Sequence, residues 1–297
     1  MKNSQSRRKA IKNITAGTAA LTAAPFLSSN AKSSIFDDME QLQLKGNINH
    51  SVCRWCYGDI PFEDLCKAAK ELGLKSIELT GPEEWPIQKK YGLTCAMPWG
   101  AGMGIEKGWN NPALHDELIK SYTEHIPKVA AAGYDKLICF SGNRNGMSDA
   151  QGIQNCALGL KKLMPIAEKY KVTLVMELLN SKVDHKDYQC DHTAWGADLC
   201  KAIGSEYFKL LYDIYHMQIM EGDIIRTIRE NIKYIAHFHT GGNPGRNEID
   251  ETQEIFYPAV MKAIVELGYK GFVSQEFIPK NPNKLASLKK GIEICDV

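Results

Sequence analysis

The sequence lacks two features by which common classes of binding protein are recognised. No GxGxxG or GxxxxGK[ST] turn follows the first predicted strand, so a nucleotide-binding open sheet loses its usual signature. No charge of one sign dominates either, because 36 Lys and Arg residues balance 35 Asp and Glu residues and leave a formal net charge of +1. Without a broad electrostatic field, neither nucleic acid nor an anionic membrane surface is expected as a partner.

Long apolar runs are missing beyond the first thirty residues, so no stable membrane insertion is expected there. The start of the chain differs, because a cationic segment containing Arg7 and Arg8 precedes an uncharged stretch from Ile14 to Leu27. This layout resembles a twin-arginine export signal, with cleavage predicted after Ala31. A disordered basic tail or a membrane anchor is the alternative. We therefore expect a signal over residues 1–31, a linker over 32–45 and an exported, periplasmic protein.

A disulfide framework is also missing. The nine cysteines are an odd total, and most of them lie within apolar runs, which is typical of small buried side chains. Cys53 and Cys56 have the spacing of a redox or zinc pair, but no second such pair completes a zinc site. We therefore expect the cysteines to pack in the core and not to form a redox or zinc site.

From Gly46 onward, short β-like runs alternate with amphipathic helical stretches. Gly73, Gly133 and Gly268 each end a predicted helix shortly before a strand begins, as in the short loops of wound α/β folds. Eight strands are predicted, over residues 47–52, 76–80, 93–99, 136–141, 172–179, 208–214, 235–240 and 271–277. Eight such units favour an α/β (β/α)₈ TIM barrel as a single domain over residues 46–297, and a doubly wound open sheet is the main alternative.

Four consecutive predicted strands each deliver one side chain that could bind a metal. In a barrel, the carboxyl ends of the strands form one shared rim, so these side chains should meet there. They are Glu177, Asp213, His239 and Glu276. Taken singly, each could be a helix cap, an ion-pair partner or a core histidine. Taken together, three carboxylates and an imidazole suit one divalent ion, with Mn²⁺, Mg²⁺ or Co²⁺ favoured and Zn²⁺ left open.

Two further runs carry a resemblance to a known family. Residues 211–218 (LYDIYHMQ), followed by EGD at 221–223, and residues 242–248 (GNPGRNE) resemble the hydroxypyruvate isomerases. That family lies within the xylose isomerase-like TIM barrels, beside the ketose 3-epimerases, and the resemblance extends from Asn47 to the C-terminus. It implies that the four residues bind one metal and that His216 and Arg246 contact the substrate. His239 stands where these isomerases often carry Gln, which points toward the epimerases.

Such a site predicts proton transfer on a small sugar-like molecule. An isomerase or epimerase must remove a weakly acidic C–H proton next to a carbonyl and pass through an enediolate, which a metal stabilises. Glu177 and Glu276 are the expected proton-transfer groups. Trp55 and Trp99 could form an apolar wall against a sugar face, or could pack on loop backbone.

Three other functions stay open on the sequence alone. The same metal could serve a hydrolase or lyase acting on a keto-glycoside in the cell envelope. A barrel that binds sugar without catalysis is a further alternative. A metal-dependent nuclease is disfavoured by the neutral charge. The sequence leaves open the sugar, the metal and the oligomeric state, a homo-oligomer included.

Overall fold

The computed structural model describes residues 42–297, so the predicted signal and residues 32–41 of the predicted linker lie outside the described residues. In the described part of the chain, seven strands form one parallel sheet in the order β2-β1-β7-β6-β5-β4-β3. The strands are β1 (Asn49–Cys53), β2 (Ser76–Glu78), β3 (Lys136–Cys139), β4 (Thr173–Glu177), β5 (Phe208–Asp213), β6 (Ile235–Thr240) and β7 (Phe272–Gln275).

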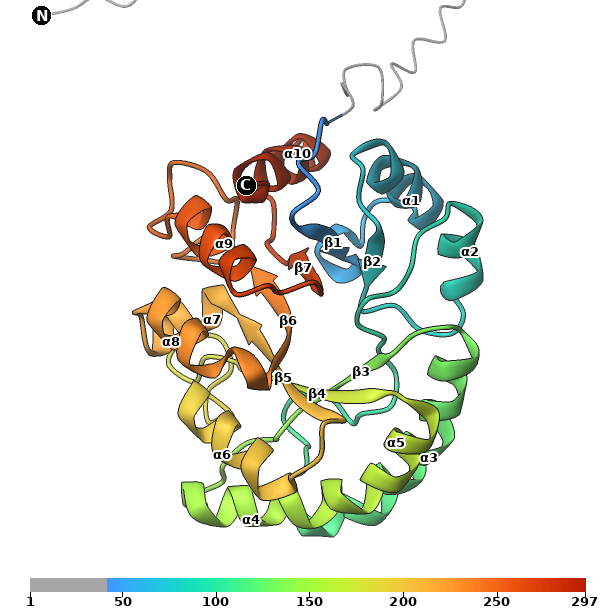
Figure 1. Cartoon of the computed structure of the whole chain (residues 1–297), viewed down its shortest axis with the longest axis vertical. Coiled ribbons are helices and arrows are strands. Elements are labelled where there is room, and N and C mark those ends of the chain that lie inside the picture. Colours follow the sequence, from blue (N-terminus) through green and yellow to red (C-terminus); the bar gives the residue numbers. More distant parts are fainter. Residues whose placement is uncertain (1–41) are drawn as a thin grey trace, which may run out of the picture. The chain divides into compact units, whose positions relative to one another are not determined.

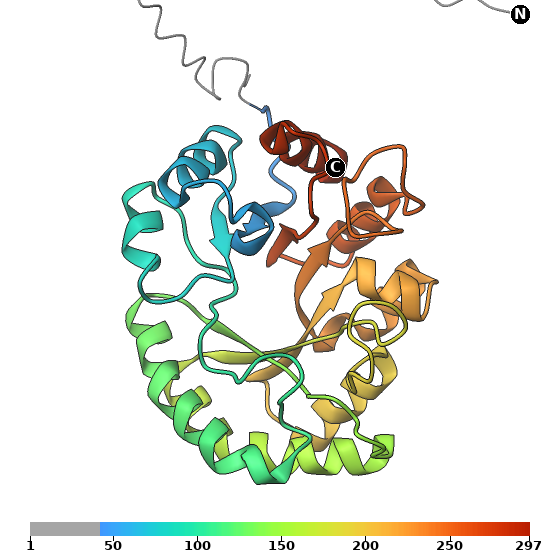
Figure 2. The same ribbon diagram turned by 180° about the vertical axis from the view of Figure 1, so that it is seen from behind.

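The sheet curls on itself, and helices cover its outside (Figures 1 and 2). β1 pairs with β7 and with β2, so that Ser51 lies opposite both Ser274 and Ser76. The helices are α1 (Phe62–Glu71), α2 (Trp85–Lys90), α3 (His115–Ala131), α4 (Asp149–Leu160), α5 (Met164–Tyr170), α6 (Thr193–Ile203), α7 (Ile214–Met220), α8 (Ile224–Asn231), α9 (Tyr257–Glu266) and α10 (Lys284–Cys295). This curled parallel sheet confirms the predicted TIM-barrel class.

One predicted strand is wrong. Residues 93–99 form no strand of the sheet and make only an isolated bridge, between Thr94 and Ser76. The segment still spans the space between β2 and β3, since Leu79 N donates to Met97 O at 2.9 Å and Ile138 N donates to Pro98 O at 3.3 Å. It cannot form a regular ladder because Pro98 has no N–H and the N–H of Ala96 bonds to the Ser76 hydroxyl instead.

The predicted joints between helices and strands are confirmed. Gly73, Gly133 and Gly268 have φ values of 77°, 81° and 74°, a left-handed conformation that stops a helix at little steric cost. The predicted bounds of the other seven strands agree with the structure to within two residues, and β6 coincides with its predicted range. Each joint brings the chain directly into the next strand, so the carboxyl ends of the strands meet at one rim.

The core lies between the sheet and its helices, and the cysteines belong to it. All nine cysteines are free and buried. Burial raises the pKa of the Cys53 and Cys56 thiols well above their usual range, which favours the uncharged thiol in the metal-free protein. The prediction that these cysteines pack as small apolar groups is therefore supported.

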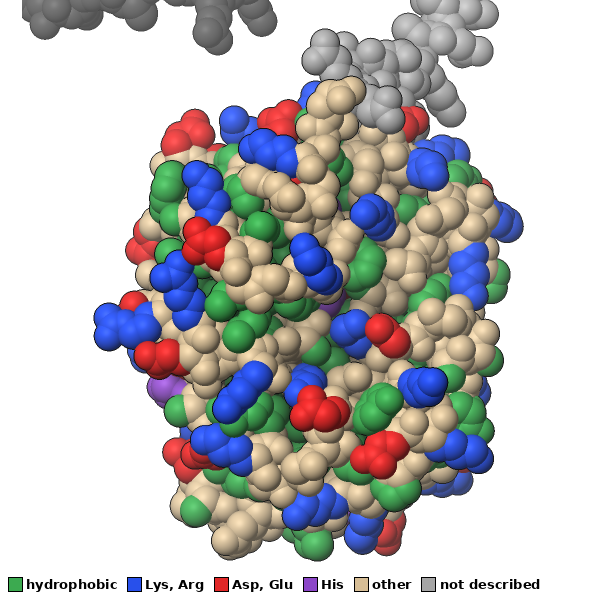
Figure 3. Space-filling view, viewed as in Figure 1, with side chains coloured by type: hydrophobic (Ala, Val, Ile, Leu, Met, Phe, Trp, Pro, Cys, Tyr) green, Lys and Arg blue, Asp and Glu red, His purple; other side chains and the backbone are tan. Residues whose placement is uncertain are grey.

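The surface carries both signs of charge without a field of one sign. Figure 3 shows Lys and Arg side chains interspersed with Asp and Glu side chains over the face in view. Within residues 42–297, no helix combines the length and the apolar character needed to cross a bilayer.

Candidate metal centre and substrate cavity

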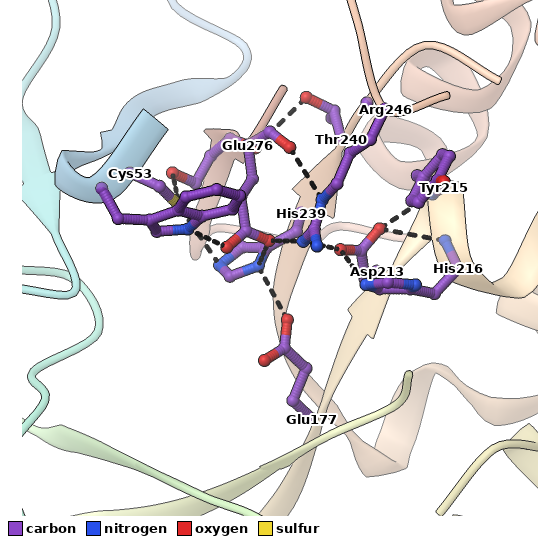
Figure 4. A network of polar contacts seen from close by, with 12 residues as sticks. Cys53, Glu177, Asp213, Tyr215, His216, His239, Thr240, Arg246 and Glu276 are labelled. Atoms are coloured by element: carbon purple, nitrogen blue, oxygen red, sulfur yellow. Dashed lines mark hydrogen bonds and ion pairs between the residues drawn. The ribbon is translucent and has the colours of Figure 1, made fainter. Parts of the chain in front are cut away.

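The four predicted ligand residues meet at the carboxyl ends of β4 to β7. Glu177 ends β4, Asp213 ends β5, His239 lies one residue before the end of β6, and Glu276 follows β7 directly. One nitrogen or oxygen atom of each lies within 4.8 Å of the others, and all four side chains are buried. Figure 4 shows the three carboxylates arranged around the His239 ring. Residues separated by as many as 99 positions (276 − 177) are therefore brought into one cluster.

Asp213 has two roles, one for each oxygen. Its Oδ1 accepts hydrogen bonds from the backbone N–H groups of Tyr215 at 2.9 Å and His216 at 3.2 Å, which caps the start of α7. Its Oδ2 lies 3.1 Å from Arg246 Nη2. The helix cap that the sequence left as an alternative is thus present, and it orients the second oxygen toward the cluster.

Arg246 is the cation that pairs with these acids. Its Nη2 lies 2.5 Å from Glu276 Oε2, and its guanidinium lies over the ring of Trp55 at 5.3 Å. Arg246 has a φ of 57°, a left-handed conformation that is uncommon outside glycine and is often found at functional sites. Although burial raises it, the charges of Arg246 and His239 hold the pKa of Glu276 well below its usual range.

Both ring nitrogens of His239 face carboxylates. Nδ1 lies 2.6 Å from Glu276 Oε2 and 3.1 Å from Glu177 Oε1. Nε2 lies 2.7 Å from Glu78 Oε1, on β2. Although burial alone lowers it, the Glu276 carboxylate raises the pKa of His239 well above its usual range. His239 therefore carries a proton on Nδ1 in the metal-free protein, at the position where a cation would sit.

The cluster has more negative than positive charge. The four carboxylates, those of Glu78, Glu177, Asp213 and Glu276, face Arg246 and three histidines, of which burial lowers the pKa of His216 and His237. Burial raises the pKa of Asp213 to about 7, and burial together with Glu276 raises the pKa of Glu177. Glu177 and Glu276 contact one nitrogen of His239, and an oxygen of Asp213 lies within 4.8 Å of them. This buried and mainly oxygen donor set fits a divalent cation such as Mn²⁺, Mg²⁺ or Co²⁺.

His216 is fully buried behind Asp213. Asn180 Oδ1 accepts the backbone N–H groups of Val183 and Asp184, so its Nδ2 donates to His216 Nδ1 at 2.6 Å. The proton of the neutral imidazole must then sit on Nε2, which lies 3.6 Å from Asp213 Oδ2 and has no hydrogen-bond partner. Burial and the nearby Arg246 lower the pKa of His216 well below its usual range. His216 is thus a neutral N–H donor beside the cluster.

A cavity of about 450 Å³ opens above the cluster. Its lining residues are Trp55, Leu79, Trp99, Ile105, Ile138, Phe140, Glu177, Leu179, His185, Arg246 and Glu276. Trp55 and Trp99, for which the sequence left open an apolar wall or packing on loop backbone, both line this cavity and are 44% and 40% exposed. Trp55 Nε1 donates to Glu276 Oε1 at 2.7 Å, which fixes the indole beside this carboxylate. Asp213, His216 and His239 lie behind the lining.

Glu78 and Leu79 were not predicted as site residues from the sequence, whereas His185, which follows β4 and was a candidate to cover the site or to lie on the surface, lines the cavity. Glu78 is an acid within a predicted buried strand, which is the same signal that identified Glu177, and it could have been found in that way. Leu79 lines the cavity and has a φ of 56°. A leucine within an apolar run does not stand out in the sequence, so its position in the site could not be predicted. Glu248, two residues after Arg246 in the chain, is engaged elsewhere, because its Oε1 accepts from Lys280 N at 2.7 Å and Asn281 N at 2.8 Å.

Comparison with curated proteins places the chain among isomerases. It is 33% identical over 242 residues to 2-oxo-tetronate isomerase of Cupriavidus necator, covering 75% of this chain and 90% of the relative. It is 27% identical over 238 residues to hydroxypyruvate isomerase of Escherichia coli, with the same coverage of both chains. These relatives confirm the predicted enzyme class, an isomerase.

Solved structures share the fold. AP endonuclease, family 2, from Brucella melitensis superposes with a TM-score of 0.73 at 20% identity, covering 82% of this chain and 97% of that one. D-psicose 3-epimerase, solved in the presence of D-fructose, gives a TM-score of 0.66 at 16% identity, with coverage of 83% and 90%. The model of the xylose isomerase-like TIM barrel family matches residues 66–295. The chain therefore belongs to the xylose isomerase-like TIM barrel family, as its sequence motifs predicted.

Proposed function

We propose that this protein is a metal-dependent isomerase or epimerase that transfers a proton next to the carbonyl of a keto-sugar. The observation that carries the proposal is the position of Glu177 and Glu276. Both line the cavity, and both contact the same nitrogen of His239, so a substrate held there would lie within reach of two carboxylates. The curated isomerase relatives support the same class of reaction.

The two carboxylates are not equivalent. Both oxygens of Glu276 are engaged, Oε1 by Trp55 and Oε2 by Arg246 and His239, and its pKa is low. Glu177 receives one side-chain contact, from His239, while burial raises its pKa toward the range of a general base. We assign Glu177 as the group that first takes the proton, and Glu276 as the anion that returns it on the opposite face.

The neighbouring donors would hold the oxygens of the substrate. Arg246 reaches the cavity with its guanidinium fixed by two carboxylates and two aromatic rings. A divalent metal bound by Glu177, Asp213, His239 and Glu276 would supply electrostatic stabilisation for the negative charge of the enediolate. The floor of the cavity is buried, and the low polarity of such surroundings would strengthen each of these interactions.

Solvent deuterium exchange tests this function. Protein reconstituted with Mn²⁺ is incubated in D₂O with hydroxypyruvate, 2-oxo-tetronate, fructose, tagatose and psicose, and NMR follows the C–H group next to each carbonyl. The proposal predicts exchange in at least one of them. Release of a reducing sugar from a keto-glycoside without exchange would support the hydrolase alternative, and binding without either reaction would support a non-catalytic barrel.

We also propose that the protein is exported to the periplasm. Support comes from the basic start with Arg7 and Arg8, the uncharged stretch after it, and the absence of any exposed thiol among the nine cysteines. Fractionation of cells that express the full chain should recover it in the periplasm. Replacing both arginines by lysine should retain it in the cytoplasm, and equal periplasmic recovery of this variant would contradict the twin-arginine route.

A further inference from the structure

A second cavity, of about 640 Å³, adjoins the first. The two share Trp99, Ile105 and His185 in their linings. The remaining lining residues of the second cavity are Gly104, Glu106, Asn143, Val183, Asp184 and Lys186. The groove formed by the two cavities therefore runs from the candidate metal centre, past Trp99 and His185, to the loop that follows β4. Nothing in the proposed proton transfer uses its outer half.

Backbone hydrogen bonds between loops hold the outer cavity open. Asn143 forms an antiparallel bridge with Tyr188, and its N–H donates to Glu106 O at 3.0 Å. Arg144 N donates to Asp187 O at 2.7 Å, and Asn145 N donates to Asp187 Oδ2 at 2.8 Å. The loops after β3 and β4 are thus joined to each other and to the segment around Glu106. A site formed in this way exists before a ligand arrives.

The two cavities differ in chemistry. The inner one has mostly apolar walls above the carboxylates, while the outer one presents the amide of Asn143, the imidazole of His185, the carboxylate of Glu106 and the ammonium of Lys186. Trp99 stands where they meet, and its ring packs against Phe140 at 5.8 Å with the rings at 60°. A fixed indole beside hydrogen-bonding groups suits a sugar ring, which has an apolar face and a rim of hydroxyls.

Charge argues against an acidic ligand. Arg246 is the one Lys or Arg that lines the inner cavity in the part of the chain the structure describes, and Asp213 and Glu276 already neutralise it. In the outer cavity, Lys186 is outnumbered by Glu106 and Asp184. The acidic side chains that line the outer cavity therefore outnumber Lys186, and this balance disfavours a second unit that carries a carboxylate or phosphate.

We propose, resting on the function above, that the substrate is a neutral saccharide of two units. Its keto-sugar unit lies over the candidate metal centre, and its second sugar unit occupies the outer cavity beside Trp99. Pockets of about 300–1,000 Å³ enclose drug-sized ligands, and the inner cavity alone suffices for one sugar unit. The outer cavity, which is the larger, then selects for the second unit.

Isomaltulose, a glucosyl unit joined to the far end of fructose, is a suitable probe, with fructose as the one-unit comparison. The linkage leaves the carbonyl and its neighbouring C–H free, so both sugars can undergo the same exchange. Using the full Mn²⁺-loaded protein, we expect the KM for deuterium exchange to be at least tenfold lower for isomaltulose than for fructose.

The variant Val183→Trp would fill the outer cavity. Val183 is 60% exposed, so the change needs no room in the core. We expect it to remove most of the preference for isomaltulose over fructose, taken as the ratio of kcat/KM values. Leu158 is similarly exposed, at 57%, but lies on α4 and lines neither cavity, so Leu158→Trp should leave the ratio unchanged.

The outcomes separate this proposal from the proposed function. Exchange with fructose or a 2-oxo acid that equals or exceeds exchange with isomaltulose, and that is insensitive to Val183→Trp, would overturn the two-unit substrate and leave the isomerase intact. If no sugar exchanges deuterium, calorimetric titration with isomaltulose tests whether the outer cavity binds it. Isomaltulose binding that Val183→Trp abolishes would support the outer site and refute proton transfer, whereas no binding would refute both.

Discussion

Glu78 Oε1 and His239 Nε2 lie 2.7 Å apart, and both residues are fully buried. A carboxylate on one ring nitrogen fixes the orientation and tautomer of a metal-binding histidine, because it holds the proton on that nitrogen and directs the other toward the metal. Although burial raises it, His237 and His239 lower the pKa of Glu78 to about 2, so this carboxylate is ionised. Glu78 is therefore a positioning residue for Nδ1 of His239.

Replacing Glu78 by Gln should weaken metal binding without changing a ligand. Loss of the carboxylate lets the imidazole rotate and lowers its basicity, and we expect the Kd for Mn²⁺ to rise by about 10- to 100-fold. Isothermal titration calorimetry measures it. Asp296→Asn is the matched control, since it alters another buried carboxylate–histidine pair, with His50 at 3.3 Å, and should leave the Kd unchanged. Equal Kd values for Glu78→Gln and the wild type would refute the positioning role.

Glu177→Gln should abolish most proton exchange. A positioned general base contributes about 10²- to 10⁴-fold to such a reaction, and an amide cannot replace it. The rate of deuterium incorporation at saturating Mn²⁺ separates this loss from weaker metal binding. Glu254→Gln is the control, because Glu254 is exposed and contacts only Gln218 by its side chain. Near-normal exchange in Glu177→Gln would show that another group acts as the base.

Metal binding should weaken as the pH falls. A metal must displace the proton on His239, whose pKa lies well above its usual range, and it requires Asp213 ionised, whose pKa burial raises to about 7. Below pH 7 both groups hold protons, so binding releases them, and each released proton costs up to about tenfold in affinity per pH unit. The Kd for Mn²⁺ should be larger at pH 6 than at pH 8, and a pH-independent Kd would contradict the assignment of these ligands.

Gly108→Ala tests the packing of the loop that borders the groove. A Cβ at Gly108 would overlap the backbone of Phe140, Ser141 and Gly142, which has no flexible side chain to move. We expect a loss of about 1–3 kcal/mol in the free energy of unfolding, measured by urea denaturation. Gly58→Ala is the control, since its Cβ would meet only Trp55 O at 3.5 Å and its φ is −60°. A fully stable Gly108→Ala variant would show that this loop is packed differently.

The sequence by itself determined the barrel class and the members of the candidate metal cluster. β4, β5 and β6 each carry an acid or a histidine within an otherwise apolar run, and Glu276 directly follows β7. That local contrast indicates a buried functional group. The helix-ending glycines are equally local, because a left-handed residue is required wherever the helix stops. Such signals depend on neighbours in the chain, so a single sequence contains them.

Only the tertiary structure decided the contacts between distant segments. Glu78 and His239 are 161 residues apart, and the residues around each of them in the sequence do not indicate that the two side chains pair. Residues 93–99 have the composition of a strand. They form no regular ladder, because Pro98 lacks an N–H and the N–H of Ala96 bonds to the Ser76 hydroxyl. The outer cavity exists because Asn143 and Tyr188 pair across two loops. The physical reason is the same in each case: these interactions form between groups that are distant in the sequence, and only the folding of the chain brings them within hydrogen-bonding distance.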